Sequence, residues 1–133
     1  MTRTGGCACG AVRFVATGEP WRVGVCHCMT CRKTHGAPMH AFAVFPRDRV
    51  TVSGTLTEWR SSGPLGRLFC PTCGSHVLRH EDPDEVEVMV GAFDEPDRFR
   101  PTYELWIGRR ESWLPAVAPR QYAGNRQGPA RTE

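Results

Sequence analysis

Apolar and polar residues alternate in several short stretches of this chain. The stretches with a period of two cover residues 11–16, 40–45, 50–52, 56–59 and 85–90. This alternation places every second side chain on one face, as in a half-buried β-strand. Two more strands are expected at residues 65–69 and 103–107, and Ser53-Gly54 predicts a tight hairpin turn between two of the alternating stretches.

Helical periodicity is weak in comparison. No long stretch has the helical repeat, and 14 glycines and 11 prolines divide the chain into pieces of strand length. We expect one or two helical turns that are capped by Thr30 and ended by Gly36 and Pro38. The patterns predict a mainly β fold of short antiparallel strands in one domain over residues 1–115, followed by a loosely ordered tail over residues 116–133.

The length of the chain and its N-terminal segment indicate what size and location to expect for the protein. With 133 residues the chain has the size of a single domain that gains stability from metal cross-links. It contains no apolar run of about twenty residues, and residues 1–6 have no apolar signal-peptide core. We therefore expect a cytoplasmic protein with reduced thiols and no membrane partner.

Seven cysteines fall into three groups, and within each group they are close enough in sequence to bind one metal ion. The groups are Cys7-Ala8-Cys9, Cys26-His27-Cys28-Met29-Thr30-Cys31 and Cys70-Pro71-Thr72-Cys73. Zinc takes four protein ligands in a structural site and three plus an open position in a catalytic site. Seven thiolates therefore divide as four plus three, which predicts two zinc ions per chain.

The segment Cys70-x-x-Cys73-Gly74 has the composition of a zinc knuckle that supplies two ligands. Gly74 permits the positive φ that such a turn needs. The segment Cys7-x-Cys9-Gly10 is the best candidate for the other two ligands. In the alternative interpretation, these are unrelated buried or reactive thiols.

The second group of cysteines has three sulfurs within six residues. Cys26, Cys28 and Cys31 can surround one face of a tetrahedron and leave the fourth position open. A side chain between two ligating neighbours points away from their ion, so we expect His27 to lie behind the ligands or at the surface. A site closed by His27 or by another residue, and an iron–sulfur cluster, are the alternatives.

A zinc ion with three thiolates activates water poorly but binds another soft ligand well. A sulfur-bearing substrate therefore fits this ligand set better than hydrolysis does. Arg32 and Lys33 can hold the carboxylates of a peptide-like thiol, and His35 can move a proton. The alternative for these residues is a solvated polar loop, and His40 is a weaker candidate because it alternates within an expected strand.

The net charge of +3 is weak evidence for a nucleic-acid partner. Zinc held by four thiolates contributes about −2 and zinc held by three contributes about −1, which brings the total close to zero. Of the 17 basic residues only Lys33 is a lysine, and the arginines are scattered rather than arranged in a stripe. We therefore expect no nucleic-acid partner.

Four motifs, in this order, resemble the family of glutathione-dependent formaldehyde-activating enzymes, the GFA family, also called the centromere-protein-V domain family. The motifs are Gly6-Cys7-x-Cys9-Gly10, Cys26-His27-Cys28-x-x-Cys31-Arg32, Phe69-Cys70-x-x-Cys73-Gly74-Ser75 and Val90-Gly91-x-Phe93-Asp94-x-Pro96. The resemblance covers about residues 4–115 and implies a small zinc-stapled fold of the Mss4-like kind. It also implies two ligand sets, which are Cys7, Cys9, Cys70 and Cys73 for a structural zinc and Cys26, Cys28 and Cys31 for a catalytic zinc.

The activity that this resemblance implies is the making and breaking of a carbon–sulfur bond in S-hydroxymethylglutathione. We therefore expect a lyase that acts on an adduct of a small thiol, glutathione or a similar one, with an aldehyde such as formaldehyde. The alternative is a non-catalytic zinc module that binds a protein partner. Glu104 stands where family members often carry a histidine, and Met39 stands where aromatic residues are common. Both departures bear on the substrate and leave the zinc ligands unchanged.

Overall fold

The computed structural model describes residues 1–80, 82–129 and 131, and in this part of the chain the protein is mainly β, as the sequence predicted. The strands are β1 (Thr2–Gly6), β2 (Arg13–Thr17), β3 (Arg22–Cys26), β4 (His40–Pro46), β5 (Val50–Ser53), β6 (Thr57–Trp59), β7 (Arg67–Phe69), β8 (His76–Arg79), β9 (Glu85–Met89), β10 (Tyr103–Leu105) and β11 (Arg120–Gln121). The helical elements are α1 (Met29–His35) and the short 3-10 helices η1 (Arg47–Arg49), η2 (Val90–Ala92) and η3 (Ile107–Arg109).

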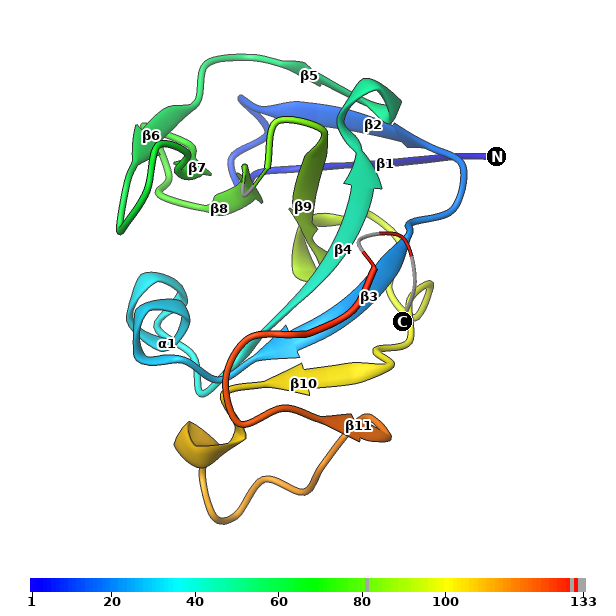
Figure 1. The fold of residues 1–133 in the computed structure, drawn as a ribbon. Helices are drawn as coiled ribbons and strands as arrows, with labels where there is room; N and C mark the ends of the chain where they lie inside the picture. Colours follow the sequence, from blue (N-terminus) through cyan, green and yellow to red (C-terminus); the bar gives the residue numbers. More distant parts are fainter. Residues whose placement is uncertain (81, 130, 132–133) are drawn as a thin grey trace.

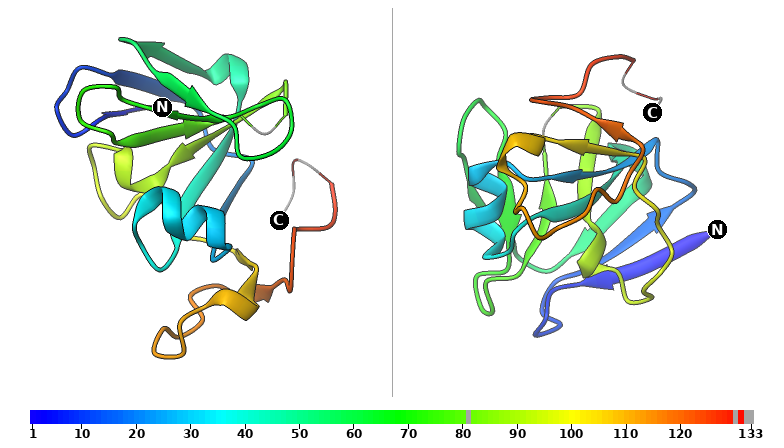
Figure 2. Two further views of the ribbon diagram at one scale, coloured as in Figure 1. Left: turned by 90° about the vertical axis from the view of Figure 1, so that its left-hand side faces the viewer. Right: turned by 90° about the horizontal axis from the view of Figure 1, so that it is seen from below.

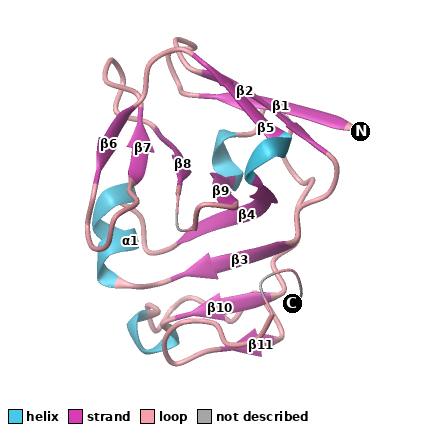
Figure 3. Ribbon diagram, turned by 45° about the horizontal axis from the view of Figure 1, so that its top comes forward, coloured by secondary structure: helices cyan, strands magenta, loops and turns pink. Residues whose placement is uncertain are grey.

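The strands form two sheets (Figures 1 and 3). A three-stranded sheet has the order β1-β2-β5, and an eight-stranded sheet has the order β11-β10-β3-β4-β9-β8-β7-β6. Most neighbouring strands are antiparallel, as expected, but β10 is parallel to both β3 and β11. The parallel pairs bring the end of β3, which carries Cys26, beside the end of β10.

The core lies between the small sheet and one face of the large sheet. Phe14 of β2 packs edge-on against Phe93, with ring centroids 5.0 Å apart, and both rings are buried. Phe45 of β4 and Val88 of β9 are fully buried in the same cluster. Burial of several such side chains, at roughly 1.5–3 kcal/mol each, holds the two sheets together. The views in Figure 2 show α1 outside these layers, beside the ends of β3 and β4.

The short helix forms where it was expected, but a different residue caps it. Cys28, not Thr30, is the N-terminal cap of α1, and its sulfur accepts a hydrogen bond from the backbone N–H of Cys31. The helix ends as predicted at Gly36, which adopts the left-handed conformation. The cap position draws the sulfurs of Cys28 and Cys31 together.

The hairpin predicted at Ser53-Gly54 is wrong. β5 pairs with β2 in the small sheet, whereas β6 pairs with β7 in the large one, so this turn carries the chain from one sheet to the other. Gly54 has a φ of +93°, and a Cβ there would lie 2.3 Å from the carbonyl oxygen of Ala11. Glycine is needed here because the backbone passes close to the backbone of Ala11, not because the turn forms a hairpin.

Residues 120–124 lie within the range 116–133, over which we expected a loosely ordered tail, and they are held by hydrogen bonds to the rest of the fold. β11 pairs with β10, and the backbone N–H of Tyr122 donates to the carbonyl of Glu104. Backbone N–H groups of Trp106 and Ile107 donate to carbonyls of Gly124 and Tyr122. Long-range pairing with β10 orders this segment, although its sequence has no strand periodicity. The domain boundary at residue 115 stays a prediction.

Gly24 lies in the middle of β3, where β3 meets β10, and provides a test of this arrangement. A Cβ at this position would lie 2.5 Å from the ring of Tyr103 and 2.9 Å from the ring of Phe42. We expect Gly24→Ala to lower the free energy of unfolding by about 1–3 kcal/mol, because an overpacked core must shift both rings. Urea denaturation measures this loss. Gly108→Ala is the matched control, since a Cβ there meets no atom within 4 Å. Equal stability of the two variants would contradict the packing described.

Candidate metal centres and active site

Four cysteine sulfurs meet between the two sheets. Cys7 follows β1 and Cys9 lies in the turn before β2, while Cys70 follows β7 and Cys73 lies in the turn before β8. The ligand atoms of these four residues lie within 4.8 Å of one another. As predicted, the N-terminal pair thus completes the knuckle from the middle of the chain.

The spacing of these sulfurs suits a tetrahedral ion. Zinc–sulfur bonds of about 2.3 Å at tetrahedral angles place neighbouring sulfurs roughly 3.8 Å apart. The sulfur of Cys9 lies 3.6 Å from that of Cys7 and 3.8 Å from that of Cys70. Gly74 adopts the positive φ of +78° that the knuckle turn requires. This group can hold a metal ion with four thiolates.

Three further sulfurs meet at the end of β3. Cys26 is the last residue of β3, Cys28 caps α1, and Cys31 lies in the first turn of α1; their sulfurs lie within 4.8 Å of one another. Hydrogen bonds from the thiols of Cys26 and Cys31 lower the pKa of Cys28. Hydrogen bonds with Cys28 and Cys31, together with burial, raise the pKa of Cys26. A metal ion that binds this group would have to displace the protons that the sulfurs share.

The three-sulfur group forms part of the wall of a cavity of about 460 Å³. Charged and polar side chains on this wall come from β4, β7, β8, β9, η3 and the C-terminal segment: His40, Arg67, Arg79, Glu87, Arg109 and Asn125. Ser61 and Ser62 line the same cavity. A small polar ligand that contacts one of the sulfurs therefore also meets charged groups.

His27 is fully buried and faces away from the cavity into a network around Glu104. Its Nε2 lies 2.7 Å from Oε1 of Glu104, and both side chains have an exposed fraction of 0 %. The second carboxylate oxygen of Glu104 accepts hydrogen bonds from the backbone N–H groups of Val117 and Ala118 and from Nε2 of Gln121. Glu104 therefore joins the loop between Cys26 and Cys28 to the C-terminal segment.

This network determines the charge state of Glu104. Burial alone would raise its pKa, but hydrogen bonds from Gln121, His27 and the two backbone N–H groups outweigh burial and lower the pKa to about 2. The carboxylate is thus ionised above about pH 2. His27 and the backbone N–H of Ala118 are buried, and loss of the carboxylate would leave them unpaired at a cost of about 1–3 kcal/mol per group.

The structure places the predicted substrate-binding residues away from the three sulfurs. Arg32 forms an ion pair with Glu111 and donates hydrogen bonds to the carbonyls of Pro38 and Arg109, so it fastens α1 to the segment after η3. Lys33 lines a different, apolar cavity beside Trp59. Neither residue is among those that line the three-sulfur cavity in the described part of the chain.

Histidines lie in a row behind the three-sulfur group. His35, the predicted proton-moving residue, stacks on His40 with ring centroids 4.4 Å apart, and His76 lies 5.1 Å from His35. Of the three, His40 lines the three-sulfur cavity. Burial lowers the pKa of His35 to about 4, with contributions from His76 and Arg67, and burial lowers the pKa of His40 well below its usual value. These imidazoles are neutral near pH 7 and can accept a proton only from a strong acid or a charged intermediate.

Sequence reasoning missed Arg67 and gave little weight to His40. Arg67 is 36 residues from Cys31 in the sequence, and no spacing rule connects them, yet its Nη2 lies 3.6 Å from the Cys31 sulfur. His40 is directly opposite Cys26 in the pairing of β3 with β4. The sequence placed His40 correctly in a strand. The signal that would have identified it as a site residue is the face of that strand on which its side chain lies.

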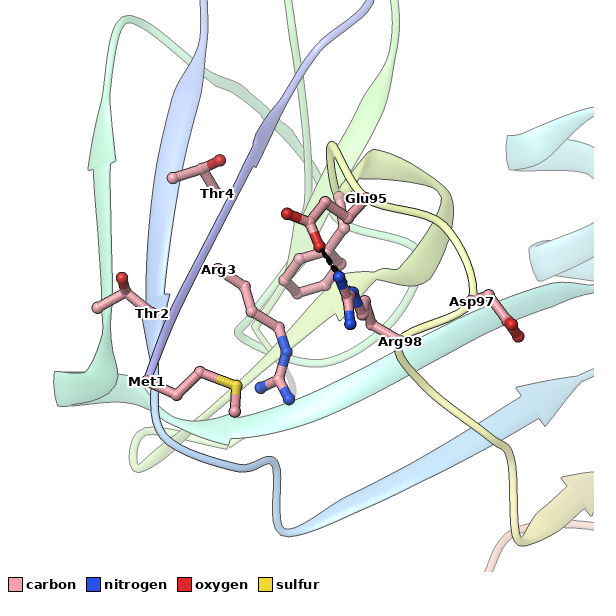
Figure 4. Close-up of a pocket in the computed structure, with 8 residues that line it drawn as sticks. Met1, Thr2, Arg3, Thr4, Glu95, Asp97 and Arg98 are labelled. Atoms are coloured by element: carbon pink, nitrogen blue, oxygen red, sulfur yellow. Dashed lines mark hydrogen bonds and ion pairs between the residues drawn. The ribbon is translucent and has the colours of Figure 1, made fainter.

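A second cavity of about 460 Å³ lies at the N-terminal edge of the molecule, lined by residues 1–4 and by residues that follow η2 (Figure 4). Glu95 and Arg98 on its wall form an ion pair with each other. None of the seven cysteines borders it. Arg3 on its wall pairs with Glu19, so both arginines of this cavity already have a carboxylate partner and the cavity is a weaker candidate than the three-sulfur one.

Comparison with known proteins gives the family. Residues 2–109 match the sequence profile of the glutathione-dependent formaldehyde-activating enzymes, and the chain belongs to this family. A Halomonas elongata protein named for the same glutathione-dependent formaldehyde-activating activity is 30% identical over 127 residues, which cover 86% of this chain and 80% of that protein. The chain is thus a member of a family named for an enzyme activity.

Two further comparisons agree in part. An uncharacterized lyase of Schizosaccharomyces pombe is 32% identical over 71 residues; the match covers 53% of this chain and 52% of that protein, so it spans about half the length of this relative. A crystal structure of a Rhodobacter sphaeroides protein superposes with a TM-score of 0.56 at 25% identity, over 70% of this chain and 91% of that chain. Among the described residues, no helix is long and apolar enough to cross a membrane.

Glu104→Gln tests the buried network. We expect the free energy of unfolding to fall by about 3 kcal/mol, because the substitution removes a buried carboxylate that four donors share. The backbone amides of Val117 and Ala118 should exchange hydrogen faster, which mass spectrometry measures. Glu95→Gln is the control, since Glu95 belongs to an exposed ion pair that contributes about 0–1 kcal/mol. Unchanged exchange at residues 117–118 in Glu104→Gln would contradict the role of this carboxylate.

Proposed function

We propose that this protein is a zinc-dependent carbon–sulfur lyase that acts on an adduct of a small thiol, such as glutathione, with an aldehyde, such as formaldehyde. The observation that carries the proposal is a group of three sulfurs, not four, in the wall of a polar cavity. Family membership supports the same reaction class. The cytoplasm, where thiols stay reduced, is the proposed location.

The two sulfur groups have different proposed roles. Cys7, Cys9, Cys70 and Cys73 would hold a structural zinc that joins the start of the chain to the β7–β8 turn. Cys26, Cys28 and Cys31 would hold the catalytic zinc. With three thiolates, the fourth position is left for the sulfur of the substrate. When bound, this zinc supplies an attachment point that favours the thiolate form of the substrate.

The chain's own residues account for the rest of the proposed mechanism. Polar side chains of the cavity wall would contact the thiol adduct, and the loop of Cys26 and Cys28 is held in place by Glu104 through His27. His40 is better placed than His35 to exchange a proton with the ligand, because it lines the cavity and its buried Nε2 has no partner in the described part of the chain. His35 stacks behind it and fixes the ring.

Substitution of single ligands should separate the two metal sites. Cys73→Ser should yield unfolded or insoluble protein, because a structural zinc contributes directly to folding. Cys28→Ser should remain folded and contain about one zinc instead of two, which elemental analysis and circular dichroism measure. If both variants unfold alike, the three-sulfur site is structural as well and the lyase proposal loses its support.

Cobalt substitution tests whether the three-sulfur site accepts a thiol. Addition of glutathione to the cobalt protein should intensify the sulfur-to-metal charge-transfer absorption, since a fourth thiolate joins three others. The same addition to the cobalt form of Cys28→Ser is the control and should change the spectrum little. If glutathione, cysteine and other small thiols all leave the wild-type spectrum unchanged, the position is closed and a non-catalytic zinc module becomes the better interpretation.

A further inference from the structure

Arg67 is a buried cation beside the three-sulfur group. It is the first residue of β7, its exposed fraction is 3 %, and it lines the cavity together with the three cysteines. One nitrogen, Nη2, lies 3.6 Å from the Cys31 sulfur. The other two, Nε and Nη1, are buried and have no hydrogen-bond partner in the part of the chain that the structure describes.

The neighbours of Arg67 do not neutralise it. Arg79 lies opposite Arg67 in the β7–β8 pair, and the nearby carboxylate of Glu87 lies 3.6 Å from Arg79 rather than pairing with Arg67. The charge of Arg67 contributes to the lowered pKa values of His35 and His40, which are already lowered by burial. The guanidinium thus lies near neutral histidines as well as near the Cys31 sulfur.

An unpaired buried guanidinium is costly, and this cost is recovered when an anion binds next to it. The sulfur ligands are one source of negative charge, and they meet only Nη2. Arg32, the arginine that the sequence suggested for this purpose, is already paired with Glu111. Three arginines line the cavity in the described part of the chain. Arg79 lies 3.6 Å from Glu87 and Arg109 is exposed to solvent, so Arg67 is the buried one with donors left for an anion.

We propose that Arg67 binds the oxygen anion that forms next to the substrate sulfur when a thiolate adds to an aldehyde. This inference rests on the proposed function and names a residue for its charged intermediate. The ligand class is an oxyanion two or three bonds from a sulfur held at the three-cysteine group. Arg67 touches this group directly through Cys31, so a short ligand spans both.

The step balances without another reactant. The thiolate sulfur gives an electron pair to the aldehyde carbon, the C–S bond forms, and the C=O π pair moves onto oxygen to give an alkoxide. The alkoxide accepts hydrogen bonds from N–H groups of Arg67 and then takes up one proton, which balances the proton that the thiol lost on becoming the thiolate, to become the hydroxyl of the adduct. In reverse, the hydroxyl loses the proton, the C–S bond breaks and its electron pair returns to sulfur. Donors positioned for the developing oxyanion stabilise this step in both directions.

Two small thiols of the same skeleton test the anion site. Mercaptoacetate carries a charged oxygen near the sulfur, and 2-mercaptoethanol carries a neutral one. We expect the cobalt protein to bind mercaptoacetate about tenfold or more tightly than 2-mercaptoethanol, since a charge-assisted hydrogen bond adds to the metal–sulfur bond. In Arg67→Gln this preference should fall to about threefold or less, while the affinity for 2-mercaptoethanol stays within about threefold.

Controls separate this inference from its alternatives. Arg60→Gln removes an exposed arginine that pairs with Glu58 and should keep the wild-type preference. Arg67→Lys keeps a cation and should retain part of the preference. This variant replaces Arg67→Gln in the test if Arg67→Gln does not fold. A wild-type protein without the preference overturns the proposal on its own. A preference that survives in Arg67→Gln also overturns it, because the carboxylate then binds the metal rather than the guanidinium.

A sulfur ether distinguishes failure of this inference from failure of the proposed function. Methylthioacetate carries the same carboxylate but forms no thiolate, and it should raise the melting temperature of the wild-type zinc protein and not that of Arg67→Gln. If thiols bind without any dependence on Arg67, the lyase proposal stands and the anion site is refuted. If no thiol changes the cobalt spectrum, the lyase proposal fails, and the response to the ether alone decides whether Arg67 binds anions.

Discussion

The buried contact between Glu104 and His27 is the constraint on which the candidate active site depends. Its two side chains have no exposed surface, and the contact ties the loop between Cys26 and Cys28 to β10. A buried carboxylate is tolerated only when donors surround it, and here the donors are His27 just after β3, the backbone of residues 117–118 and Gln121 of β11. The family match ends at residue 109, so residues 117–121, which lie after it, support the Cys26–Cys28 loop, which lies within it.

The two sulfur groups differ in how the rest of the fold holds their cysteines in place. The four-sulfur group joins turns that lie about sixty residues apart, so metal binding there closes the fold between the two sheets. The three-sulfur group comes from one continuous segment at the junction of β3 and α1, whose position is already fixed by strand pairing and by the cap at Cys28. In the function that we propose, an ion at the first group would serve stability, and an ion at the second would exchange ligands without loosening the fold.

The surroundings of the three-sulfur group favour an anion and hold few protons. Burial keeps the nearby histidines neutral, as the lowered pKa values of His35 and His40 indicate, and Arg67 supplies positive charge. A cavity of this kind stabilises negative charge on sulfur or on an adjacent oxygen. In the proposed reaction each group of this cavity therefore has its own role: the sulfurs hold the metal, Arg67 faces the oxygen anion, and His40 exchanges the proton.

The sequence by itself determined the features that depend on local spacing. Cysteines two or three residues apart point to one ion whatever the rest of the fold, and alternation identified the strands around Phe14 and Val88. The first of these strands has one face in the core, and the second alternates acidic and apolar residues although it is buried throughout. The sequence did not reveal β3, whose buried residues lie on both faces and include Gly24, so that no alternation exists to read. The tertiary structure alone decided that β5 leaves its expected hairpin partner, that β11 joins the large sheet, and that Arg67, His40 and Glu104 meet the cysteine loop. These contacts join residues tens of positions apart, and they depend on strand order and register, which follow from how two whole sheets bury their apolar faces together.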